Sequence, residues 1–159
     1  MPHTLRQDDL DFLDRAPVRQ IRSAVVDLPI GQVFHELANR PEGWPRWFRV
    51  ARDCRYESAP PYGVGTLRRM SLRGGLVAQE KVLAWDEDKR FAYRIDDLNA
   101  PGFRALMEEW TVERTAEGRT RLQWVFAIEG TKPVQLLLRL GRPALDHVFK
   151  QAAHRMANP

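Results

Sequence analysis

Six strand-like segments, each bounded by turn signals, follow one another through the middle of this 159-residue chain. Runs rich in β-branched and aromatic residues alternate with clusters of Gly, Pro, Asp and Asn, which favour tight turns. Because consecutive strands joined by short connections pair with each other, the pattern predicts an antiparallel meander. The expected strands cover residues 50–57, 65–73, 75–85, 90–97, 103–115 and 119–129.

One face of the predicted sheet is strongly apolar. Side chains two residues apart share a strand face, which groups Phe91, Tyr93 and Ile95 in one strand and Trp124 with Phe126 in another. Only the last segment, residues 133–156, is long enough to cover this face, and its apolar residues recur at helical spacing. They are Leu136, Leu137, Leu140, Leu145, Val148, Phe149, Ala152, Ala153 and Met156, with a bend or break expected at residues 141–143.

The N-terminal part of the chain adds one strand and one short amphipathic helix. Residues 18–27 contain the β-branched residues of a strand, and residues 30–37 then place apolar side chains at helical spacing. Residues 1–17 are polar and acidic, so we expect a tail or a short helix that packs on the outside. The remainder, residues 18–157, is expected to form a single domain around one core.

The stretch PEGWPRWFRV, residues 41–50, concentrates two of the five tryptophans of the chain. Its two prolines and Gly43 leave room for at most one helical turn, over residues 42–47. Trp44 and Trp47 are three residues apart and can point to the same side of that turn. They would form one apolar edge, with Phe48 beside them.

Four fragments occur in order along the chain: DLPIGQVFHELANRPEGWPRWF, GVGTLRRM, EKVLAWDEDKRFAYRI and EEWTVERTAEGRTRLQWVF. Together they resemble the START-like (SRPBCC) superfamily, in its polyketide cyclase/dehydrase and lipid transport branch, over about residues 18–157. The resemblance implies an α+β helix-grip fold, a curved antiparallel sheet of about seven strands wrapped around a long C-terminal helix, with two short helices after the first strand. It also implies a deep cavity between the sheet and that helix. Trp44 and Trp47 would lie near the open end of this cavity, where they either form its rim or wall or fill the corner between the short helices and the sheet.

The charge pattern argues against a nucleic-acid partner. The net charge of +4 comes from 25 Lys and Arg against 21 Asp and Glu, and the basic residues are scattered rather than gathered on one face. No run approaches the roughly 18 apolar residues of a membrane span, and the N-terminus lacks the apolar core of a secretion signal. We therefore expect a cytoplasmic monomer or homodimer without nucleic-acid or integral-membrane association.

Metal and cofactor chemistry has little support in the sequence. Cys54 is the only cysteine, which permits neither an internal disulfide nor a cysteine metal cluster. His147 and His154 lie seven residues apart on the last helix, about 10 Å along its axis, too far to share an ion. We expect no metal and no cofactor, and we interpret His147 either as a solvent-facing residue or as a general base.

Three residues are candidates for chemistry inside the cavity. Glu108 shares its strand face with Trp110, whereas Glu109 lies on the other face, so one carboxylate must point to the inner face. A carboxylate in an apolar cavity needs a partner. Arg68 could supply it, although the same pair could equally form on the outer surface. Tyr93 offers a hydroxyl that could orient a ligand or act as an acid.

Apolar candidates for ligand contact are more numerous than polar ones. They are Trp44, Trp47, Phe91, Tyr93, Trp110, Trp124, Phe126 and Phe149. By resemblance, the turns at Gly74 and Gly75 and around Pro101 flank the cavity entrance. The paired glycines either gate that entrance or simply form a tight turn.

Two functional hypotheses follow from these patterns. The chain either binds a hydrophobic small molecule, such as a lipid, an isoprenoid or a polyketide-like ring system, or acts as a cyclase or dehydratase with acid and base groups in the same cavity. A third hypothesis is an interaction module whose cavity is filled by side chains. The abundance of apolar wall residues over acid and base residues favours binding.

Overall fold

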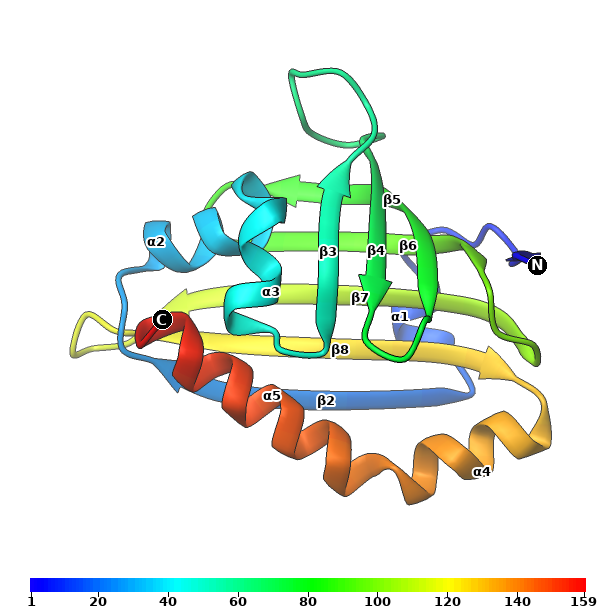
Figure 1. The fold of residues 1–159 in the computed structure, drawn as a ribbon. Helices are drawn as coiled ribbons and strands as arrows, with labels where there is room; N and C mark the ends of the chain where they lie inside the picture. Colours follow the sequence, from blue (N-terminus) through cyan, green and yellow to red (C-terminus); the bar gives the residue numbers. More distant parts are fainter.

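The computed structural model describes residues 1–159 and contains one antiparallel sheet with helices packed on both faces (Figure 1). Seven strands pair in the order β2-β8-β7-β6-β5-β4-β3, and the short β1 pairs with β6. Strands β3 to β8 are neighbours in the order in which they follow one another, which confirms the meander. The strands are β1 (His3–Thr4), β2 (Val18–Val26), β3 (Ala51–Tyr56), β4 (Leu67–Leu72), β5 (Val77–Asp86), β6 (Arg90–Leu98), β7 (Phe103–Arg114) and β8 (Thr120–Gly130).

Register shifts bend the sheet around the helices on its inner face. They occur in the β3/β4, β5/β6 and β7/β8 pairs, and an extra residue in one strand bends it and increases its twist. After β2 come α2 (Ile30–Phe34), a π-helical turn (His35–Asn39), a 3₁₀ turn (Pro41–Gly43) and α3 (Trp44–Trp47). The arrangement confirms the predicted α+β helix-grip fold.

The C-terminal segment forms two helices, α4 (Lys132–Leu140) and α5 (Arg142–Ala157), so the bend expected there is present. Gly141 ends α4, and Pro143 lies in the first turn of α5, where its missing N–H removes no helical hydrogen bond. Helix α5 packs against β2 and α3 (Figure 1) and buries Phe149 and Met156 in the main core. Neither these helices nor any other in the structure combine the length and apolarity needed to cross a membrane.

Three leucines of α4 do not cover the sheet, contrary to the interpretation of the helical spacing. Leu136, Leu137 and Leu140 are 54%, 67% and 70% exposed. Helix α4 instead packs through Val134 and Leu138. At about 3.6 residues per turn, Leu136, Leu137 and Leu140 lie on the opposite side of α4 from Val134 and Leu138, so they face away from the core.

The N-terminal segment covers part of the outer face of the sheet. Helix α1 (Phe12–Arg15) buries Phe12 and Leu13 against β7 and β8, and β1 pairs with β6. This forms a second, smaller cluster with Ala105, Met107, Val125 and Ala127. The outer face therefore has its own core, and residues 1–17 form more than a tail.

The turn between β6 and β7 fixes the start of α4. The N–H of Thr131 donates to the carbonyl of Gly102 at 2.8 Å. Gly102 has φ of +90°, and a Cβ added there would lie 2.8 Å from Cγ2 of Val134 and 3.0 Å from Oγ1 of Thr131. Glycine is therefore required for both its backbone conformation and the close approach.

We expect Gly102→Ala to lower the free energy of unfolding by about 3 kcal/mol, because steric overlap adds to the strain of a positive φ. Urea unfolding measures this change. Gly74→Ala is the matched control, since Gly74 also has φ of +90° but nothing lies within 4 Å of its added Cβ. That variant is expected to lose only about 1 kcal/mol from strain. Equal losses in both variants would contradict the packing role of Gly102.

Candidate functional site

Strand register places four polar side chains along the inner face of the sheet. Arg68 in β4 lies directly opposite Glu80 in β5, and Tyr93 in β6 lies directly opposite Glu108 in β7. Directly opposed residues on one face have Cβ atoms about 5 Å apart, close enough for their side chains to interact. The four residues therefore form two cross-strand pairs on neighbouring strands.

Arg68 and Glu80 form a fully buried ion pair. Nε of Arg68 donates to Oε2 of Glu80 at 2.5 Å. The guanidinium carbon lies 4.1 Å from the ring centre of Tyr93 and 4.6 Å from that of Trp44, so both rings contribute cation–π attraction. Burial raises the pKa of Glu80, and the charge and hydrogen bond of Arg68 oppose that rise. The Nη1 and Nη2 atoms of Arg68 are buried without a hydrogen-bond partner.

Glu108 accepts two hydrogen bonds on a single oxygen. Oη of Tyr93 donates to Oε2 of Glu108 at 2.7 Å, and Nε1 of Trp124 donates to the same atom at 3.0 Å. Nε1 of Trp110 in turn donates to Oη of Tyr93 at 3.0 Å. The rings of Trp110 and Trp124 stack with their centres 5.1 Å apart, which holds both indoles in position.

The environment of Glu108 brings its titration close to neutral pH. Burial, with a smaller contribution from the negative charge of Glu80, raises the pKa of Glu108 to about 7. The hydrogen bonds from Tyr93 and Trp124 favour the ionised form and limit this rise. Burial also raises the pKa of Tyr93 well above its usual value, so its hydroxyl stays protonated and donates.

An apolar cavity of about 400 Å³ adjoins these polar residues. Of its 20 lining residues 17 are hydrophobic, and they come from the inner face of the sheet, from α3 and from α4 and α5. Glu80 and Glu108 supply carboxyl groups to its wall. The third polar lining residue is Arg73, an exposed residue beside the β4–β5 turn, so the cavity reaches the surface there.

Four of the eight residues proposed for ligand contact lie in the cavity wall, namely Trp44, Tyr93, Trp124 and Phe126. The other four, Trp47, Phe91, Trp110 and Phe149, are buried in the core behind it. Trp44 and Trp47 illustrate the difference, since their ring centres are 4.5 Å apart but only Trp44 reaches the cavity. Trp47 fills the corner between α3 and the sheet.

The predicted pairing of Arg68 with Glu108 is wrong, although both side chains are on the inner face. Arg68 bonds to Glu80, and Glu108 bonds to Tyr93 and Trp124. Strands β5 and β6 lie between β4 and β7. Three strand spacings amount to about 14 Å, which is too far for a direct ion pair.

Glu80 is the site residue that the sequence interpretation missed. It lies between Ala78 and Val82 on one face of β5, and all three are buried. A glutamate in an otherwise apolar period-2 row is the signal that could have revealed it.

The predicted gate residues lie in two turns near the cavity. Gly74 and Gly75 form the β4–β5 turn and have φ of +90° and +92°. Their neighbours Arg73 and Leu76 line the cavity. Pro101 lies in the β6–β7 turn, between the lining residues Leu98 and Phe103. A role of these turns in ligand admission stays a prediction.

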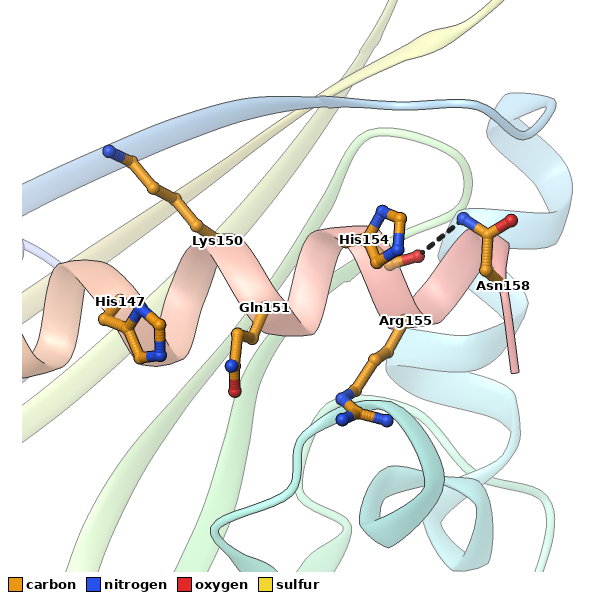
Figure 2. A pocket seen from close by; sticks show the side chains of 6 residues that line it. All are labelled: His147, Lys150, Gln151, His154, Arg155 and Asn158. Atoms are coloured by element: carbon orange, nitrogen blue, oxygen red, sulfur yellow. Dashed lines mark hydrogen bonds between the residues drawn. The ribbon is translucent and has the colours of Figure 1, made fainter.

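A second hollow, of about 410 Å³, lies on the outer side of α5. Figure 2 shows the six residues around it, all polar: His147, Lys150, Gln151, His154, Arg155 and Asn158. His147 is exposed and does not line the apolar cavity, so it faces solvent. No apolar side chain lines this hollow, which makes the inner cavity the candidate site.

The curved antiparallel sheet with its C-terminal helices is a START-like fold. The chain belongs to the polyketide cyclase / dehydrase and lipid transport family, whose model matches residues 19–158. This confirms the resemblance seen in the sequence. Uncharacterised proteins of Mycobacterium tuberculosis and Mycobacterium bovis are 33% identical over 144 residues, which cover 89% of this chain and 84% of each relative.

Solved structures share the fold at low sequence identity. A START superfamily protein from Mycobacterium smegmatis superposes with a TM-score of 0.72 and 14% identity, covering 88% of this chain and 97% of that chain. Major latex-like protein 151 from Panax ginseng gives a TM-score of 0.61 and 19% identity, covering 84% of this chain and 97% of that chain. At such identities the likeness concerns the fold alone.

The titration of Glu108 predicts a pH-dependent stability. Its pKa is 4.5 in the unfolded chain and about 7 in the folded protein. Between these two pKa values the folded protein holds a proton on Glu108 that the unfolded chain has released. The free energy of unfolding therefore falls as the pH rises from about 4.5 to about 7, and it stays at the lower value above pH 7. Glu108→Gln has no such titration. The difference in unfolding free energy between this variant and the wild type should therefore shift in favour of the variant by about 2 kcal/mol between pH 5 and pH 8, measured by urea unfolding at each pH.

The neighbouring Glu109→Gln is the control for this measurement. Glu109 projects from the outer face of β7, where it pairs with Arg90. The same pH-dependent gain in both variants would contradict the assignment of the effect to the inner carboxyl group.

Proposed function

We propose that the chain binds a hydrophobic small molecule, such as a lipid, an isoprenoid or a polyketide-like compound, in the cavity between the sheet and the C-terminal helices. The observation that carries this proposal is the cavity of about 400 Å³ with 17 hydrophobic residues among 20. Ligand sites in proteins have volumes of roughly 300–1,000 Å³ and combine apolar walls with a few polar groups. Each Å² of apolar ligand surface that the cavity removes from water contributes about 25 cal/mol to the free energy of binding.

The side chains of the core do not fill the cavity, which argues against an interaction module with a filled cavity. The large rings of Trp47, Phe91 and Trp110 pack behind the wall rather than across the cavity. Leu138, Leu145 and Val148 contribute the helical side of the wall. The opposing walls therefore do not meet.

A contact quencher tests this placement. We expect 1-bromodecane to quench tryptophan fluorescence of the wild type, because bromine quenches only indoles that it touches. Trp44→Phe and Trp124→Phe should each lose part of the quenching, whereas Trp47→Phe should retain it, since Trp47 does not reach the cavity. If neither cavity variant loses any quenching, or if Trp47→Phe loses as much as they do, the assigned wall is wrong.

An acid–base enzyme is the second candidate, favoured by one observation. A general acid or base works best when its pKa lies near the operating pH. The pKa of Glu108 is raised to about 7, and the Tyr93 hydroxyl donates to it at 2.7 Å. Both groups face the cavity. A polyketide-like chain held there could exchange protons with Glu108 during cyclisation or dehydration.

Native mass spectrometry of the protein from its own host distinguishes the two candidates. We expect a stoichiometric apolar compound that denaturing extraction releases unchanged, which supports binding. Recovery of a precursor together with its cyclised or dehydrated product would favour the enzyme instead. In that case Glu108→Gln should accumulate the precursor, because Gln cannot exchange the proton.

A further inference from the structure

Glu108 presents one carboxyl oxygen that the protein leaves without a partner. Both hydrogen bonds to this residue, from Tyr93 and Trp124, go to Oε2, and Oε1 accepts none. Glu108 lines the cavity and is only partly buried, so this oxygen is not sealed behind the wall. A carboxyl oxygen in an apolar cavity gains most from a hydrogen-bond donor.

The side-chain donors in the inner part of the cavity wall are already committed to partners inside the protein. The Tyr93 hydroxyl and the Trp124 indole donate to Glu108. The Trp110 indole donates to Tyr93, and the Trp44 indole donates to the carbonyl of Leu37 at 3.0 Å. With Glu108 ionised, an acceptor group on a ligand would therefore meet no free side-chain donor at this end of the cavity.

The guanidinium of Arg68 does not change this conclusion. Its unpartnered Nη1 and Nη2 atoms are fully buried, and Arg68 is not among the lining residues. The rings of Tyr93 and Trp44 pack against the guanidinium, with their centres 4.1 Å and 4.6 Å from its carbon atom. Arg68 thus acts on the cavity through Glu80, whose charge it balances.

The charges near Glu108 leave its own carboxylate unbalanced. Arg68 pairs with Glu80, and Arg22, which packs over Trp124, pairs with Asp146 at 2.7 Å. Arg73 is at the cavity mouth, where its Nε donates to the carbonyl of Arg49. The lining residues of α4 and α5, namely Leu138, Leu145 and Val148, carry no charge. A ligand carboxylate placed beside Glu108 would add a second uncompensated negative charge in an apolar site.

We propose that the ligand of this cavity carries a hydrogen-bond donor, a hydroxyl or a protonated amine, at its inner end. Oε1 of Glu108 accepts the hydrogen bond from this donor. Ligands that end in a carboxylate are disfavoured. The inference rests on the proposed binding function and specifies its ligand class. A hydroxyl would satisfy the free oxygen, and an ammonium would also balance the charge of Glu108.

Three compounds with the same ten-carbon chain test the proposal by isothermal titration calorimetry at pH 8. We expect 1-decanol and decylamine to bind the wild type at least about tenfold more tightly than decanoate, a difference of about 1.4 kcal/mol. Decylamine binding tighter than 1-decanol would identify a cationic ligand, and the reverse order would identify a neutral alcohol. Decanoate binding as tightly as 1-decanol would overturn the inference.

Variants separate the role of Glu108 from that of Arg73 at the mouth of the cavity. Glu108→Gln should weaken decylamine about tenfold and strengthen decanoate, whereas Glu109→Gln on the outer face should change neither. If Glu108→Gln leaves all three affinities unchanged, the polar group of the ligand does not contact Glu108 and the inference fails. Decanoate binding that Arg73→Gln abolishes would place the polar group at the mouth and would also overturn it.

The same data distinguish the failure of this inference from that of the proposed function. If all three compounds bind with equal affinity, the cavity holds apolar ligands but does not select a donor, and only the inference is lost. If none of them binds, and 1-bromodecane quenches no tryptophan, both the proposed function and the inference are overturned.

Discussion

The permanent positive charge of Arg68 in the protein interior is the constraint on which the site depends. A buried charge without a partner would cost several kcal/mol, and here Glu80 lies directly across the strand pair to balance it. The rings of Trp44 and Tyr93 pack against the guanidinium. Because these partners come from α3, β5 and β6, the charge ties the short helix to the sheet. Tyr93, fixed in this way, directs its hydroxyl at Glu108.

The two inner carboxyl groups consequently differ in chemistry although they share one face and one cavity. Glu80 is balanced by a guanidinium, whereas Glu108 has only neutral donors, from Tyr93 and Trp124. Neutral donors support a negative charge less than an ion pair does, which is why burial shifts the pKa of Glu108 to about 7. One carboxyl group thus stabilises the architecture, and the other is available to a ligand or a reaction.

Much of this site was predictable from period-2 alternation alone. The pattern placed Tyr93 on the apolar face and put Glu108 and Glu109 on opposite faces, with one of the two pointing inward. The structure shows that the inward one is Glu108. The same rule, applied to β5, would also have found Glu80 among Ala78 and Val82. The rule fails for partners, because alternation says which face a residue occupies and nothing about how many strands separate it from another. Arg68 was therefore assigned to Glu108, which lies three strands away.

The sequence by itself determined the strands, their meander, the two short helices and the break at Gly141, since these depend on local periodicity and turn chemistry. Only the tertiary structure decided that Trp44 lines the cavity while Trp47 fills a corner, and that Leu136, Leu137 and Leu140 of α4 remain exposed. Both outcomes depend on how rigid elements are oriented after they pack. Apolar residues spaced for a helix specify that a face exists, but the contacts that this face makes are fixed by elements distant in the sequence.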